Sequence, residues 1–155
     1  MAVFREATTI SVLDECCRRE LAVIESYRQS LRSLNAGAHT SVLAKALRSH
    51  ERRVEWLAER IRFFRAQPPD SAGARGAVAK LAEGAAAAIG YQLGVAAVED
   101  EEVRLTRLYL SRVLELDADS RKLMQKEIIP AQFETQRAVS ELKQQAQATS
   151  WSQSP

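Results

Sequence analysis

The chain has 155 residues, of which 46% are hydrophobic and 27% are charged, as is usual for a single globular domain. Its 22 basic and 20 acidic side chains give a net charge of +2, and the two signs alternate along the sequence. The chain lacks the basic region of a nucleic-acid-binding protein, and no apolar run of about 18 residues predicts a membrane span. We therefore expect a cytoplasmic protein that neither binds nucleic acid nor inserts into a membrane.

The first predicted helix runs roughly from residue 10 to residue 34, after an N-terminal extension over residues 1–9. Its seam, the row of side chains that faces the core, advances in steps of three and four and is interrupted by Glu20. The seam consists of Ile10, Leu13, Cys17, Glu20, Ile24, Tyr27, Leu31 and Leu34. Side chains of neighbouring residues diverge on a helix, so we expect no disulfide, with Cys17 in the core and Cys16 a partly exposed thiol.

The second predicted helix runs roughly from residue 42 to residue 66, and His50 interrupts its seam. That seam consists of Leu43, Leu47, His50, Val54, Leu57, Ile61 and Phe64. The connection before it is short, so the first two helices should be antiparallel neighbours. Arginines on this helix, Arg53 among them, alternate with glutamates in a pattern that predicts exposed ion pairs.

A long crossover over residues 67–90 follows, because Pro68 and Pro69 cannot continue the helix. Its Ala- and Gly-rich part, residues 77–90, predicts either a separate crossover helix or an early extension of the third helix. In the third helix, Glu102 interrupts a regular seam. That seam consists of Tyr91, Val95, Val98, Glu102, Leu105, Tyr109, Val113 and Leu116.

The fourth predicted helix, roughly residues 121–146, follows a turn and cap at Asp117 to Ser120. Pro130 predicts either a kink in this helix or a later start. Its main stripe consists of Met124, Ile128, Ala131, Thr135, Ala138 and Leu142, bordered by Ile129, Gln132, Gln136 and Val139. Residues 149–155 are polar and predict a flexible tail, so the bundle should span residues 10–148.

Glu20, His50 and Glu102 each lie near the middle of their own helix, so an antiparallel bundle would bring them to one level. Gln136 lies at a similar depth and is the expected fourth member of this buried polar layer. Each of the two glutamates is followed seven residues later by a tyrosine, Tyr27 in one case and Tyr109 in the other. The shared spacing indicates two related helical hairpins joined by the crossover.

These features resemble the ferritin-like superfamily, whose metal site takes one Glu from each of two helices and Glu-x-x-His from each of the other two. The stretches 17–27, 99–109 and 129–139 are also similar to a bacterial family of this superfamily that carries the label "domain of unknown function". The resemblance covers about residues 10–146. It implies an all-α, ferritin-like antiparallel four-helix bundle with one long crossover between the second and third helices.

Carried over by the resemblance, Glu20 and Glu102 match the single glutamates and His50 matches one histidine of such a metal site. Half of the ligand set is missing, because Leu47, Phe133 and Gln136 stand at the remaining positions. Three interpretations of the layer stay open. It is a hydrogen-bonded network without a cofactor, or a single divalent metal held with a neighbour such as Glu99 or Glu51, or a set of residues split apart because the predicted seams are out of phase.

We therefore expect a non-enzymatic bundle with a degenerate metal site, which acts by self-assembly or by binding a protein partner. A metal-binding oxidase or storage protein, holding iron, manganese or zinc, is the alternative. We expect a homodimer, since Trp56, Phe63 and Tyr91 leave spare aromatic surface on a long bundle.

Overall fold

The computed structural model describes residues 2–32, 38–73 and 91–151, and these residues form helices and turns without any strand. The long helices are α1 (Ala2–Arg32), α2 (Ala38–Phe63), α4 (Tyr91–Arg112) and α6 (Ile129–Trp151). Between the last two lie a 3-10 turn, η1 (Val113–Glu115), a short helix, α5 (Ala118–Leu123), and a π-helical turn, η2 (Met124–Ile128). The prediction of an all-α chain is confirmed.

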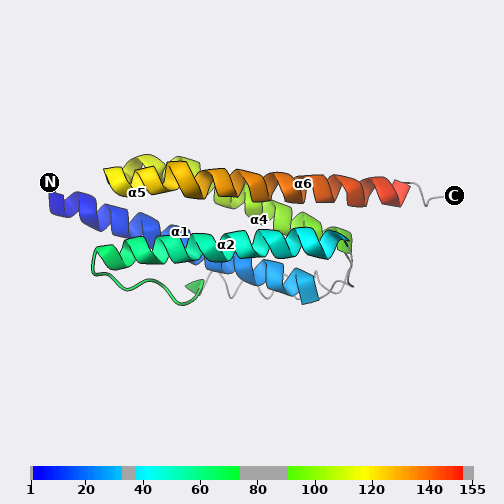
Figure 1. The fold of residues 1–155 in the computed structure, drawn as a ribbon, viewed down its shortest axis with the longest axis horizontal. Helices are drawn as coiled ribbons and strands as arrows, with labels where there is room; N and C mark the ends of the chain where they lie inside the picture. Colours follow the sequence, from blue (N-terminus) through cyan, green and yellow to red (C-terminus); the bar gives the residue numbers. More distant parts are fainter. Residues whose placement is uncertain (1, 33–37, 74–90, 152–155) are drawn as a thin grey trace.

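The long helices pack side by side, and every pair of close neighbours is antiparallel. Helix α1 contacts α2 and α4, and α6 contacts the same two helices from the other side. In Figure 1, α1 and α6 run in one direction along the molecule, whereas α2 and α4 run in the other. No helix in the described ranges is both long and apolar enough to cross a membrane.

Some predicted boundaries are wrong. Helix α1 begins at Ala2, so residues 2–9 continue the first helix and do not form a separate extension. Thr9 is fully buried, and its hydroxyl oxygen accepts a hydrogen bond of 2.9 Å from the backbone N–H of Asp117. Helix α6 continues to Trp151, while residues 152–155 of the predicted tail and residues 74–90 of the crossover lie outside the described residues.

The conformation of the segment between α4 and α6 is explained by individual residues in it. The carboxylate of Asp117 caps α5 by accepting hydrogen bonds from the backbone N–H groups of Asp119 and Ser120. Farther on, Pro130 has no N–H to give to the preceding turn, and its ring would crowd a regular α-helix. The chain widens there into a π turn, in which the N–H of Ile129 bonds to the carbonyl of Met124. Helix α6 begins at this point, one residue before Pro130.

Most buried side chains above and below a central polar level are apolar, with exceptions such as Thr9 and Ser120. Every described member of the predicted third seam is buried, from Val95 in α4 to Leu116 just after η1. Both cysteines are fully buried, so the prediction of a partly exposed Cys16 is wrong. Helix α1 packs against both α2 and α4, so a wider face of this helix is buried. That face includes both Cys16 and Cys17.

Candidate functional site

The three seam interruptions meet in the middle of the bundle. Glu20 on α1, His50 on α2 and Glu102 on α4 are fully buried. His50 Nδ1 lies 2.6 Å from Glu20 Oε2, and His50 Nε2 lies 2.7 Å from Glu102 Oε1. The imidazole therefore bridges two carboxylates from two other helices.

Arg53 is a fourth charged member of this site, and the sequence prediction placed it among exposed ion pairs. It is fully buried, and its Nε donates a 2.6 Å hydrogen bond to Glu20 Oε1. One terminal nitrogen, Nη1, lies 3.2 Å from the Ser49 hydroxyl, and the other, Nη2, lies 2.5 Å from His50 Nδ1. We call Glu20, His50, Arg53 and Glu102 the charged layer.

Two buried tyrosines exchange hydrogen bonds between α1 and α4. The hydroxyl of Tyr27, on α1, donates to Glu102 on α4, while the hydroxyl of Tyr109, on α4, donates to Glu20 on α1. The Tyr27 ring also packs against the His50 ring, with 4.9 Å between ring centroids. Because the two helices are antiparallel, the same seven-residue spacing on each brings every tyrosine level with the other helix's glutamate.

Helix α6 contributes Gln132 and Thr135, and not the predicted Gln136. Gln132 is fully buried, and its Nε2 lies 2.6 Å from Glu102 Oε2 and 3.0 Å from the Glu102 carbonyl. The Thr135 hydroxyl donates to the same carboxylate oxygen at 3.1 Å. Gln136 is only half-buried and accepts a hydrogen bond from Thr106 instead. Its assignment to the buried layer is corrected to Gln132.

Both ring nitrogens of His50 face a carboxylate, so only the imidazolium form donates to Glu20 and Glu102 at once. Burial and the nearby charge of Arg53 lower the pKa of His50, but the charge of Glu20 and the hydrogen bonds from His50 to both carboxylates outweigh them and raise it. Burial likewise raises the pKa of Glu20, yet the charges of Arg53 and His50 bring that pKa below its ordinary value. With His50 protonated, two positive and two negative charges balance in the layer.

The donor set does not fit a bound metal ion. Glu20 accepts from Arg53, Tyr109 and His50, so both of its carboxylate oxygens are occupied. The oxygens of Glu102 are occupied in the same way, by Tyr27 and His50 on one and by Gln132 and Thr135 on the other. A metal would have to replace these donors, and the Glu20 carboxylate already has the buried Arg53 beside it.

The other predicted ligand positions lie away from the layer. Phe133 is 49% exposed, and Leu47 packs at the edge of the apolar core. Glu99 is bound by Lys143, and Glu51 is 2.8 Å from the guanidinium of an arginine on α1. In the described part of the chain, no group of three or more His, Cys, Asp or Glu residues is arranged to hold a metal.

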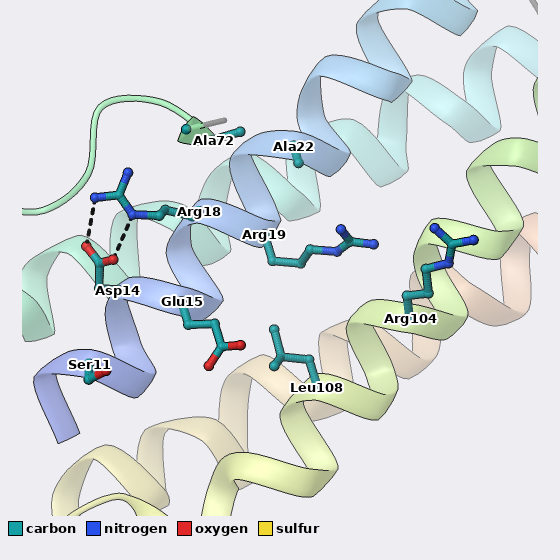
Figure 2. A pocket seen from close by; sticks show the side chains of 10 residues that line it. Ser11, Asp14, Glu15, Arg18, Arg19, Ala22, Ala72, Arg104 and Leu108 are labelled. Carbon is teal, nitrogen blue, oxygen red and sulfur yellow. Dashed lines mark hydrogen bonds and ion pairs between the residues drawn. The ribbon is translucent and has the colours of Figure 1, made fainter. Parts of the chain in front are cut away.

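A surface groove of about 620 Å³ lies between α1, α4 and the segment after α2. Figure 2 shows that Arg18, on α1, turns back to Asp14, with which it makes a 2.7 Å ion pair. Arg19 and Arg104 both pair with Glu101, at 2.5 and 3.5 Å. Since each of these three arginines already pairs with a carboxylate, the groove gives no reason to assign it a charged ligand.

Comparison of the chain with models of protein families, with curated proteins and with solved structures gives no match. The function therefore has to be argued from the charged layer and from the arrangement of the helices.

Proposed function

We propose that the protein is a non-enzymatic, ferritin-like four-helix bundle that acts by self-assembly or by binding a protein partner. In this proposal the charged layer is a structural element that stands where related bundles hold a metal. The observation that carries it is the full set of protein donors on Glu20 and Glu102, with Arg53 buried beside them.

The arrangement of the helices supports the ferritin-like part of this proposal. Helices α2 and α4 run in the same direction, so the chain between them has to join opposite ends of the bundle. Helices α1 and α4 also carry the matching glutamate and tyrosine pairs described above. A long crossover between two related hairpins is what the resemblance to the ferritin-like superfamily implies.

Exposed apolar side chains support the assembly part of the proposal. Leu110 and Leu114 follow each other by one helical turn and are 51% and 72% exposed, and Phe63 is 68% exposed. Trp56 is only half-buried and lies under the Arg52 guanidinium, while the Tyr91 side chain lies outside the described part of the structure. We expect the chain to form a homodimer.

Two measurements test the proposal. Metal analysis of protein purified without a chelator should give far less than one metal ion per chain, unchanged in a His50→Ala variant. Stoichiometric iron, manganese or zinc that disappears in that variant would favour the alternative, a metal-dependent oxidase or storage protein. The observation in favour of this alternative is that Glu20, His50 and Glu102 meet in the core.

The second measurement is the molar mass in solution by light scattering. The chain should be a dimer, and Leu114→Lys should shift it toward the monomer, whereas Ser111→Lys adds the same charge at an exposed polar position and serves as the matched control. A monomeric chain that co-purifies with no partner contradicts the assembly role.

A further inference from the structure

The residues around the charged layer recur at a constant interval along the chain. Glu102 follows Glu20 by 82 residues, and Tyr109 follows Tyr27 by the same number. The second helix of each hairpin keeps this interval, which relates two further pairs of buried residues: His50 to Gln132, and Arg53 to Thr135. The α1–α2 hairpin and the α4–α6 hairpin therefore align without a gap at the layer.

The same interval relates apolar side chains above and below the layer. At several pairs of positions that it connects, both residues are buried in the bundle. These pairs are Leu13 and Val95, Cys16 and Val98, Val23 and Leu105, Ala46 and Ile128, and Leu57 and Val139. The two hairpins thus bury the same face of each helix.

The contacts of the layer follow the same relation. His50 Nδ1 lies 2.6 Å from a carboxylate oxygen of Glu20, and Gln132 Nε2 lies 2.6 Å from a carboxylate oxygen of Glu102. Within each hairpin, the second helix thus contacts the glutamate of the first helix in the same way. The two tyrosine hydroxyls are also exchanged symmetrically, since each donates to the glutamate of the other hairpin.

An approximate twofold axis between α1 and α4 accounts for these contacts. Arg19 on α1 and Glu101 on α4 are themselves 82 residues apart, and they form an ion pair of 2.5 Å. Two residues related by a twofold axis can touch each other only close to that axis. The axis therefore passes between Arg19 and Glu101, and the two glutamates of the layer, which follow these residues directly in the sequence, lie on either side of it.

The hairpins differ in the groups that they place at the equivalent positions. His50 reaches beyond its own hairpin to Glu102, at 2.7 Å, and Arg53 adds a buried guanidinium. Gln132 and Thr135 are neutral, and both donate to Glu102. One hairpin thus supplies basic side chains to the layer, and the other supplies neutral donors.

We propose that the buried faces of the two hairpins are equivalent pairing surfaces, and that residues 50 and 53, with their equivalents 132 and 135, determine which partner each face accepts. A basic face, with His and Arg at these positions, fits a neutral face, with Gln and Thr. Two basic faces would crowd four large side chains into space for two, and two neutral faces would bury both carboxylates without a cation. The proposal rests on the structural role of the layer and names the residues through which the hairpins recognise each other.

The test exchanges the two pairs of side chains in the full chain. The exchanged variant carries His50→Gln, Arg53→Thr, Gln132→His and Thr135→Arg. The neutral variant carries only the first two of these substitutions, and the basic variant carries only the last two. A shifted variant is the matched control: it has the composition of the exchanged variant but carries Gln136→His in place of Gln132→His, at a half-buried position outside the layer.

Thermal unfolding followed by circular dichroism ranks these proteins. The neutral and basic variants should each melt roughly 6 to 20 °C below the unaltered protein, because one leaves both buried carboxylates without a cation and the other overfills the layer. The exchanged variant should melt above both, since it restores one basic face and one neutral face. The shifted variant should melt as low as the neutral variant.

An exchanged variant that folds but melts no higher than the neutral, basic or shifted variant overturns the inference. If the exchanged variant does not fold, His50→Gln/Gln132→His is compared with each single substitution. The inference then requires Gln132→His to lower the melting temperature less in the His50→Gln background than in the unaltered chain, and an equal or larger loss overturns it. The proposed function depends instead on metal content and molar mass, so the two can fail separately.

Discussion

Replacing Tyr109 with Phe removes one hydroxyl from the charged layer and leaves the buried ring in place. That hydroxyl donates to Glu20, which keeps two further donors, Arg53 and His50. Burial and the neighbouring Glu20 charge raise the pKa of Tyr109 well above its ordinary value, so the hydroxyl stays protonated as a donor. The variant therefore tests a single charge-assisted hydrogen bond between α4 and α1.

A hydrogen bond to a charged group contributes about 1.5 to 3 kcal/mol, and the aromatic ring buries the same apolar surface in both proteins. We therefore expect Tyr109→Phe to lower the free energy of unfolding by about 2 kcal/mol. For a chain of this length, that loss corresponds to a fall of roughly 4 to 8 °C in the melting temperature. Ser140→Ala, which removes a partly buried hydroxyl from Glu99, should cost less than about 1 kcal/mol.

Urea unfolding followed by circular dichroism measures these differences, and a double-mutant cycle isolates the bond. In a Glu20→Gln background the tyrosine meets a neutral acceptor, so Tyr109→Phe should cost only about 0.5 to 1.5 kcal/mol. The reasoning fails if the substitution costs less than about 0.5 kcal/mol in the unaltered chain, or equally much in both backgrounds.

Three further predictions concern other parts of the core. The pKa of His50 is raised in the folded protein, so its stabilisation is complete below the ordinary value of 6.5 and is lost as the pH rises through the raised pKa. His50→Gln should therefore abolish that part of the decline in unfolding free energy at alkaline pH. An unchanged decline in the variant contradicts this prediction. Gln132→Leu should cost about 1 to 3 kcal/mol and half-buried Gln136→Leu less than about 0.5 kcal/mol, and the reverse order would refute the observed register. Burial and, to a smaller extent, nearby carboxylates raise the pKa of Cys17 to about 12 and raise that of Cys16 further. Both thiols should therefore resist alkylation until urea unfolds the chain. Rapid labelling of the native protein would contradict this prediction.

Much of the helical arrangement could be predicted because it depends on periodicity. Steps of three and four fix one face of each helix, and a polar residue that keeps the step stands out from its apolar neighbours. This is why Glu20, His50 and Glu102 could be assigned to one level before their contacts were known. The matching tyrosine spacing was also visible, although its exchange of partners between α1 and α4 required the antiparallel packing.

The missed residues share one cause. At two places a polar residue and an apolar one compete for the same core position, and the sequence prediction chose the apolar one. Val54 was preferred to Arg53, and Ala131 to Gln132, yet the polar member is buried in each case. Their burial depends on partners from other helices, which the pattern of one helix does not contain. Arg53 follows His50 by three residues and Val54 follows it by four, and Gln132 precedes Val139 by seven. Helical spacing is therefore compatible with the polar residue as well as with the apolar one.

The charged layer also divides unequally between the two helical hairpins. The α1–α2 hairpin contributes Glu20, His50 and Arg53, a net charge of +1 when His50 is protonated, while the α4–α6 hairpin contributes Glu102 and a net charge of −1. Each hairpin alone would bury an unbalanced charge, and two copies of the same hairpin would bring like charges together. The interior of the bundle thus distinguishes its two halves, so that any exchange of hairpins between chains has to pair one first half with one second half.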